Sequence, residues 1–149
     1  MVETNQNSQT SLDFNIEKFE PKNESEIQQI IKYCFKKNLP IEIVGTQTKQ
    51  GIGKKLQCAK TLNMSQFSGI IDYKPEELYI TVKAGTPIKT IQEELKKNNQ
   101  HLAFEPIDFG YFLNGKSDYG TAAGQVACNI SGSRRFKVGG IRDHVLGFR

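Results

Sequence analysis

The last third of this chain is crowded with small residues. From Phe104 to Arg149 the sequence is rich in Gly, Ser, Asn and Arg, and its apolar residues follow no sustained period. Small residues at this density let a ligand approach the backbone closely. Irregular segments longer than about 15 residues are usually either functional or disordered in compact domains, and the interleaved apolar residues argue against disorder. The pattern predicts a binding surface carried by a regular N-terminal scaffold.

The first element of that scaffold is a predicted helix that begins after Asn23. Asn23 and Glu26 have the spacing of a capping box. Asn38 and Pro40 end the helix, because proline cannot continue it. Apolar residues recur with the helical period along one side, and we expect them to form a buried stripe: Ile27, Ile30, Ile31, Cys34 and Phe35.

Three strands and a second helix are predicted in the middle of the chain. An apolar strand at 41–44 follows the first helix directly, and strands at 70–73 and 78–83 flank a turn. In the last strand, apolar residues alternate with other residues, which is the period of a half-buried strand: Leu78, Ile80 and Val82. The second helix has Thr86 as its predicted N-cap and Pro87 at its first position. Its predicted buried stripe is Ile88, Ile91 and Leu95.

Length and composition define a broad class. The chain has 149 residues, the length of one domain, and 37% of them are hydrophobic. No run approaches the roughly 20 apolar residues of a membrane span. The N-terminus has neither the basic start nor the apolar run of a signal peptide, so a cytoplasmic location is expected. The polar residues 1–13 are predicted to be a disordered tail in front of a domain spanning 14–149.

The charged residues and cysteines exclude several classes of site. All four arginines lie in the last sixteen residues, whereas the sixteen lysines are spread along a chain of net charge +4. Arginine suits bidentate contacts with anions, which favours phosphate recognition near the C-terminal end. No nucleic-acid partner is expected, because the chain has neither a basic stripe with stacking aromatics nor a named motif. Three scattered cysteines and two histidines predict neither a disulfide framework nor a metal site.

A glycine-rich segment follows the first predicted strand. Residues 45–53 read Gly-Thr-Gln-Thr-Lys-Gln-Gly-Ile-Gly. Glycines with hydroxyls and a lysine are typical of a loop whose backbone amides turn toward an anion. The spacing matches neither the G-x-G-x-x-G pattern nor the G-x-x-x-x-G-K-[ST] phosphate loop. On these residues alone, an anion-binding loop and a flexible surface turn are equally open.

The order of several segments resembles a known family. The segments are 45–53, Ser68-Gly69-Ile70, 81–87, Leu102-Ala103-Phe104-Glu105-Pro106, 120–124, 129–135 and 142–147. With them, residues 17 to 149 resemble the FAD-binding domain of the vanillyl-alcohol oxidase type, also called the PCMH type. The Ala-Phe-Glu-Pro stretch and the Ser-Gly-x-Arg-Arg…Arg-Asp-x-Val-Leu-Gly pattern resemble the branch formed by the E subunits of bacterial glycolate oxidases.

This resemblance implies an α+β fold in two lobes, with noncovalent FAD between them. Because the chain ends at Arg149, it also implies that the second lobe is incomplete and the domain truncated. The implied pyrophosphate-binding residues are Gly45, Thr46, Gln47, Thr48, Lys49 and Gly53. The residues implied to line the flavin and ribityl side are Gly120, Thr121, Ala122, Ala123, Gly124, Asn129, Ser131 and Gly132. Arg134 is implied to add a bidentate contact, and Ile141, Arg142, Asp143 and Val145 are implied to run near the cofactor.

Two of these residues depart from the family pattern. Gln47 and Ala123 stand where relatives usually have glycine. Gln47 places a side chain where the backbone is expected to need a positive φ, which only glycine adopts freely. Ala123 adds a methyl group where a close approach is expected. We therefore expect both residues to weaken FAD binding.

The resemblance also implies a function. The implied reaction is the oxidation of a small 2-hydroxy acid to a 2-oxo acid. The flavin would carry out the redox chemistry, and the protein would position the flavin and the substrate. The implied partners are the other flavin and iron–sulfur subunits of a glycolate oxidase complex, which would hold the chain near the inner face of the membrane. No catalytic base is identified, and His144 is expected to be structural because nothing nearby pairs with it. The alternatives are a truncated remnant that binds no flavin and an FAD subunit of a related D-lactate dehydrogenase.

Overall fold

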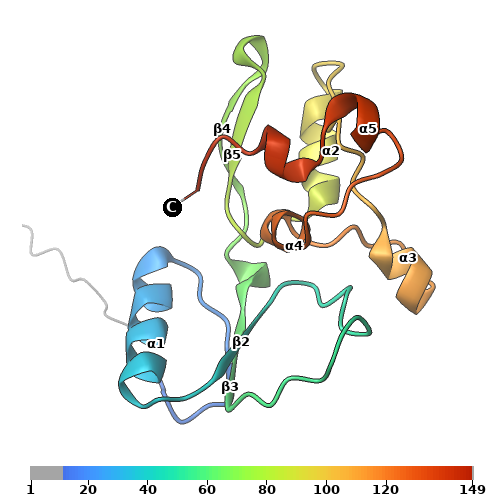
Figure 1. The fold of residues 1–149 in the computed structure, drawn as a ribbon. Coiled ribbons are helices and arrows are strands. Elements are labelled where there is room, and N and C mark those ends of the chain that lie inside the picture. The colour runs from blue at the N-terminus through green and yellow to red at the C-terminus, as the bar shows by residue number, and fades with distance from the viewer. Residues whose placement is uncertain (1–11, 149) are drawn as a thin grey trace, which may run out of the picture.

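The computed structural model describes residues 12–148, which form two small sheets with helices packed beside them (Figure 1). Most of the predicted N-terminal tail, residues 1–11, lies outside the described residues. A three-stranded sheet with helix α1 (Glu24–Lys36) forms one part of the molecule, and a hairpin with helix α2 (Ile88–Lys96) forms the other. The last third of the chain runs beside the hairpin and α2 (Figure 1). The predicted α+β class is confirmed.

The first sheet is parallel. Its strands are β1 (Lys18–Phe19), β2 (Ile41–Val44) and β3 (Lys60–Asn63), in the order β1-β3-β2. The sequence predicts β2 with its observed bounds but misses β1 and β3. Each of the missed strands is two or four residues long and carries one buried side chain, Phe19 or Leu62, so no alternating period is visible.

Helix α1 (Glu24–Lys36) begins at the predicted cap. Asn23 Oδ1 accepts a hydrogen bond from the Glu26 amide at 2.9 Å. The Glu26 carboxylate accepts from the Lys22 amide at 2.8 Å and from Asn23 Nδ2 at 2.7 Å, so it reaches one residue further back than in a standard capping box. The bond from Glu26 satisfies an amide that the first turn of a helix leaves without a partner.

The buried side of α1 is narrower than the sequence predicts. Ile30 and Cys34 pack against Phe19 and Leu62 in the core of this part, with Ile27 partly buried beside them. Burial raises the pKa of the Cys34 thiol. The other two predicted members of the stripe are exposed, Ile31 at 38% and Phe35 at 84%, and for them the prediction is wrong. A sheet of strands two to four residues long covers only the centre of the stripe.

The second part is a hairpin covered by a helix. Strand β4 (Ile70–Lys74), the 3₁₀ turn η2 (Pro75–Glu77) and strand β5 (Tyr79–Val82) form an antiparallel pair. Helix α2 (Ile88–Lys96) buries its predicted stripe against Tyr73, Ile80 and Val82, so the stripe prediction is confirmed.

Two predicted positions in this part are wrong. Leu78 is 79% exposed rather than part of the buried face, because it ends the η2 turn with a left-handed φ of 58°. Thr86 does not cap α2; the N-cap is Pro87. The fully buried Thr86 hydroxyl instead donates toward the carbonyls of Lys83 and Gly69, at 2.7 and 3.0 Å, so the helix begins later.

The last third contains four short helical segments. They are α3 (Phe109–Asn114), α4 (Ala122–Cys128), α5 (Arg135–Val138) and the 3₁₀ segment η3 (Ile141–His144); a further 3₁₀ turn, η1 (Met64–Gln66), follows β3. Segments of four to seven residues are too short to display a helical period, which explains why the sequence shows none here. One isolated bridge, Pro87 to Thr121, ties this third to the start of α2.

Among the described residues, no helix is both long and apolar enough to cross a membrane. Within the same residues, no three His, Cys, Asp or Glu side chains gather in a way that could hold a metal ion. The three cysteines are free, Cys34 buried and the other two exposed.

Candidate functional site

The two glycine segments singled out in the sequence meet in space. The 45–53 loop leaves the carboxyl end of β2, and residues 120–124 form the entry to α4. A methyl group added at Gly45 would come within 2.7 Å of Thr121 Oγ1, and one added at Gly120 would come within 3.1 Å of Thr48 Oγ1. Glycine at these two positions therefore permits the close approach of the two segments.

The backbone of the 45–53 loop offers a row of free donors. The loop turns back on itself through hydrogen bonds from Gln50 to the Gln47 carbonyl at 3.3 Å and from Ile52 to the Lys49 carbonyl at 3.0 Å. Within the described residues, the four successive amides at 46–49 donate no hydrogen bond. Gln47 has a φ of 60°, as the family pattern led us to expect, and Gly53 has a φ of 89°. Successive amides in such a turn form a concave donor cluster for an anion.

The same loop carries one cation, Lys49. Its Nζ would be 3.4 Å from a methyl group added at Gly120, and it stands 5.3 Å from the centre of the Phe109 ring, on α3. A cation over an aromatic face at this distance is attracted by the ring. The Lys49 ammonium group therefore lies where the loop meets Gly120 and α3.

Most amides at the start of α4 are already used. Ala122 donates to the Thr86 carbonyl at 2.8 Å and Ala123 to the Ala84 carbonyl at 3.1 Å, while Thr121 Oγ1 accepts from Gly124 at 3.3 Å. Within the part of the chain that the structure describes, the Thr121 amide donates no hydrogen bond. Residues 120–124 thus contribute mainly shape to the site, together with one free donor. Ala123 is an exposed helical residue without a positive φ, unlike Gln47.

The remaining predicted residues form a second cluster, held together by their own hydrogen bonds. Asn129 Oδ1 accepts from the Arg142 amide at 3.2 Å, and Ser131 Oγ accepts from the Ile141 amide at 2.9 Å. The Asp143 carboxylate accepts from the Gly140 amide at 2.8 Å. Ile141 is buried and Val145 half-buried. These side chains fix the course of the chain around η3.

Arg134 and Gly132 contact Glu105 rather than the 45–53 loop. The Arg134 amide donates to Glu105 Oε2 at 3.1 Å, and Arg134 Nε lies 4.0 Å from Glu105 Oε1. The Gly132 amide donates to the Glu105 carbonyl at 3.0 Å, and a methyl group at Gly132 would meet Glu105 Cβ at 2.7 Å. The described contacts of Arg134 therefore do not bring its guanidinium to the free amides. The exposed ion pair itself stabilises the fold little.

His144 has the structural surroundings expected for it. Its Nε2 lies 2.9 Å from the Val138 carbonyl, to which it donates, and its ring is 5.6 Å from that of Phe104.

Sequence reasoning missed two residues beside the meeting of the glycine segments. Asp118 Oδ1 accepts from the Gly120 amide at 2.7 Å and from Thr46 Oγ1 at 3.5 Å, so it bridges the two segments. Its position two residues before a glycine is the signal of an Asx turn. Gln125 is fully buried in α4, and no local pattern marks it.

A surface cavity of about 390 Å³ lies at the C-terminal end of α2. None of the predicted site residues lines it; its lining is Gln92, Lys96, Gln100, His101, Leu102, Glu105, Pro106 and Tyr119.

Comparison with protein families assigns the chain to a known family. The family described as an FAD binding domain matches residues 18–149. The chain belongs to this FAD-binding family. The FAD-binding chain is also similar to glycolate oxidase subunit GlcE from Escherichia coli (strain K12), with 37% identity over 110 residues, which are 74% of this chain and 29% of that protein. The chain therefore spans less than a third of the length of this curated relative.

Solved structures support the fold of the FAD-binding chain. Two structures of alkyldihydroxyacetonephosphate synthase, in P1 and in P212121, superpose with TM-scores of 0.67 and 0.66. Their sequence identities are 19% and 18%, and both matches cover 89% of this chain but only 26% and 23% of the other. At these identities the likeness shows the fold alone; together with the family match to residues 18–149, it confirms the predicted PCMH-type FAD-binding fold.

FAD is the cofactor of this family, and the residues present fit its pyrophosphate. Four free amides at 46–49 supply donors, Lys49 supplies a positive charge, and the glycines at 45 and 120 keep side chains out of the approach between the segments. Charge-assisted hydrogen bonds from such donors to phosphate oxygens are among the stronger ones in proteins.

Proposed function

We propose that this chain is the FAD-binding part of an oxidoreductase that oxidises a small 2-hydroxy acid to a 2-oxo acid. FAD would be held noncovalently, because the 45–53 loop contains neither histidine nor cysteine for attachment. When bound, FAD supplies the electron acceptor, and the protein supplies binding and orientation. The substrate class is proposed from the similarity to glycolate oxidase subunit GlcE.

The observation that carries the proposal is the row of amides at 46–49 without described partners, in a loop whose Lys49 ammonium group lies at Gly120. Thr48 is buried and Lys49 half-buried, whereas residues 46 and 47 are exposed. Buried amides without partners are uncommon in folded proteins, because each carries a cost in free energy. The amides at 48 and 49, in the loop that the resemblance assigns to the pyrophosphate, therefore support an anion as their partner. Gly120, seated against this loop, would form the opposite wall.

We further propose that the chain works within an assembly. The similar protein is itself called a subunit, and other flavin and iron–sulfur subunits of a glycolate oxidase complex are the partners that we propose. Such a complex would place the chain at the inner face of the membrane. Alone, the 149-residue chain is expected to reduce no dye with glycolate, because no described side chains pair as base and orienter.

The first experiment is an FAD titration with a matched pair of glycine variants. Gly120 and Gly115 both have positive φ, 79° and 67°, so alanine strains the backbone at both by about 1–2 kcal/mol. Only at Gly120 does the added methyl group meet the 45–53 loop; at Gly115 nothing lies within 4 Å. We expect Gly120→Ala to weaken FAD binding at least about tenfold, equivalent to about 1.4 kcal/mol, and Gly115→Ala to leave it near the wild-type value.

The outcomes separate the alternatives. Equal weakening in both variants would mean that strain anywhere in this third of the chain disturbs the cofactor, and would contradict the proposed wall. A wild-type chain that retains no flavin absorption after FAD is added and unbound FAD is removed by gel filtration would favour the non-catalytic remnant. If addition of partner subunits gives dye reduction with D-lactate but not with glycolate, the D-lactate dehydrogenase alternative is correct.

A further inference from the structure

One buried glutamine holds the peptide that faces the 45–53 loop. Gln125 is 0% exposed and lies on the inner side of α4. Its side-chain Nε2 donates hydrogen bonds to the carbonyls of Tyr119 and Ile107, the latter at 3.1 Å. Ile107 and Tyr119 directly precede and follow the segment 108–118, which contains α3. The Gln125 side chain therefore hydrogen-bonds to both ends of this segment.

The Tyr119–Gly120 peptide is held from both sides. Its carbonyl oxygen accepts from Gln125, and its N–H group, which belongs to Gly120, donates to Asp118 Oδ1 at 2.7 Å. A planar peptide fixed at its oxygen and at its nitrogen has little freedom to rotate. The next peptide is held as well, because the Gly120 carbonyl accepts from the Ile88 amide at 3.0 Å. With both flanking peptides anchored, Gly120 keeps its φ of 79° and its place against Thr48.

The chemistry requires an amide at position 125. Both bonds are donated by Nε2, which carries two hydrogens. Within the described residues, the buried Oε1 of Gln125 has no hydrogen-bond partner. An apolar side chain or a carboxylate of the same size could fill the space but could not serve both carbonyls.

We propose that Gln125 is a positioning residue for the cofactor. It holds the Tyr119–Gly120 peptide in the orientation that forms the wall opposite the free amides at 46–49, and it does so without touching the cofactor itself. This inference rests on the proposed function, because it takes that meeting point as the pyrophosphate site.

The test uses two variants of the full chain and one matched control. Gln125→Met keeps the size and removes both donors. Gln125→Glu removes the amide, but the protonated carboxyl group regains one O–H donor. Because burial raises the pKa of a carboxyl group, the protonated Glu is populated at about pH 5.5 and is lost by about pH 9. Gln29→Glu makes the same change on the exposed side of α1. The two readouts are protection of the Gly120 amide from hydrogen exchange without FAD, and the dissociation constant for FAD.

We expect Gln125→Met to lower Gly120 protection and weaken FAD binding, each about tenfold or more, in keeping with the loss of two buried hydrogen bonds. Gln125→Glu should resemble it at about pH 9 and recover to within about threefold of wild type at about pH 5.5, as the neutral carboxyl group donates again. Wild type and Gln29→Glu should show no such recovery. Because the Glu variant is compared with itself, the test survives a folding failure of the Met variant.

Unchanged Gly120 protection in both Gln125 variants would overturn the inference, whether or not FAD binds. Lower protection with unchanged FAD affinity would also overturn it, because Gln125 would then support the fold alone. A wild-type chain that binds no FAD would contradict the proposed function instead, and Gly120 protection would then report only whether Gln125 anchors the peptide.

Discussion

At Gln47 the backbone takes a conformation that glycine would adopt without strain. Its φ is 60°, whereas Ala123, the other departure from the family pattern, is an ordinary helical residue. We expect Gln47→Gly to raise the free energy of unfolding by up to about 1 kcal/mol, since relief of left-handed strain exceeds the added flexibility of the unfolded chain. Ala123→Gly should lower it by about 1 kcal/mol, because glycine is a poorer helix former. Urea unfolding of both variants measures this. FAD titration tests separately whether glycine at 47 and at 123 tightens binding, as the family pattern predicts.

A lower stability of Gln47→Gly would show that the Gln47 side chain stabilises the fold by more than the backbone strain costs.

The sequence predicts which residues to compare, since Gln47 and Ala123 both stand at expected glycine positions. It does not separate them, because the sign of φ depends on the turn that each residue occupies. Asp118 and Gln125 are harder still to predict, because their partners are backbone groups whose positions follow from the course of the chain.

Among the elements, α3 depends on a single carboxylate. Asp108 caps this six-residue helix, accepting from the Tyr111 amide at 2.9 Å, and it also accepts from the Ser117 hydroxyl and from the Asp118 amide at 2.9 Å. Burial raises the pKa of the Asp108 carboxyl, but the hydrogen bonds from Ser117, from the amides of Tyr111 and Asp118, and from that of Gly110 outweigh it, so the net pKa lies below its ordinary value.

A carboxyl group with a lowered folded-state pKa stabilises the fold above its unfolded-state pKa, about 3.9, and loses that contribution as the pH falls through the folded-state pKa. We therefore expect Asp108→Ala to cost about 1 kcal/mol near neutral pH, the typical value of a lost N-cap, and progressively less below about pH 4. Unfolding of both proteins across this range provides the measurement. Asp72→Ala, on β4, serves as a control; a difference between wild type and Asp108→Ala that stays constant down to pH 3 would contradict the assignment.

The elements also show where sequence patterns are informative. Helices α1 and α2 are long enough to repeat their apolar period, and the sequence predicts both, although the N-cap of α2 is Pro87 and not Thr86. Strand β3 and helix α3 exist because distant partners complete them: β3 lies between two strands, and α3 is closed by the hydrogen bond from Gly110 to the Asp118 carbonyl. Elements of four to six residues that depend on partners elsewhere in the chain are too short to show a repeating apolar pattern.

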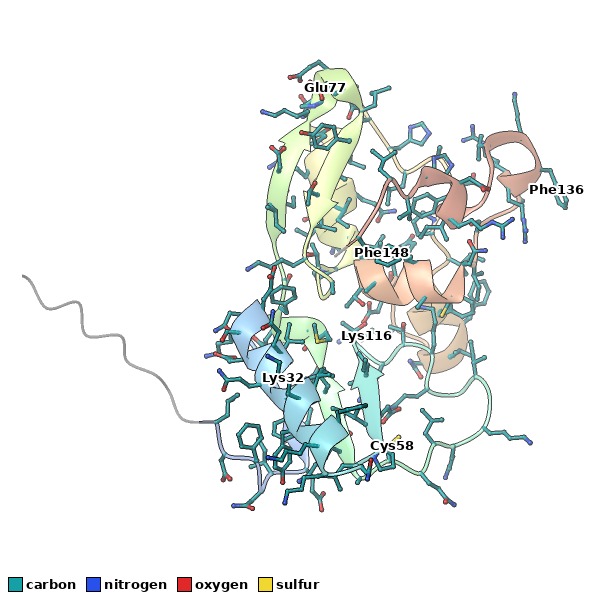
Figure 2. All side chains as sticks on the ribbon, turned by 60° about the vertical axis from the view of Figure 1, so that its left-hand side comes forward. Lys32, Cys58, Glu77, Lys116, Phe136 and Phe148 are labelled. Carbon is teal, nitrogen blue, oxygen red and sulfur yellow. The ribbon has the colours of Figure 1, made fainter. Side chains whose placement is uncertain are left out.

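In the molecule as a whole, the last third of the chain carries several exposed large apolar side chains. Phe136 is 97% exposed, Leu146 89% and Phe148 94%, and Figure 2 shows Phe136 projecting away from the ribbon. Exposed apolar surface favours association. We expect the purified chain to associate as its concentration rises, and the triple change Phe136→Ser, Leu146→Ser and Phe148→Ser to reduce this in sedimentation velocity. Lys137→Ser is the control, and a wild-type chain that stays monomeric at high concentration would contradict the expectation.

The parallel order β1-β3-β2 has a consequence for the tolerance of the chain to changes in length. Parallel neighbours cannot be joined by a tight turn, so the path from Val44 to Lys60 must travel back along the whole sheet. The proposed pyrophosphate loop occupies only the first part of this return path, and residues 54–59, all exposed, complete it. The closure entropy of such a connection grows slowly with length. A peptide tag or a reporter sequence inserted among these six residues would thus lengthen a path that the topology already requires, and would leave the sheet register and the loop at 45–53 as they are.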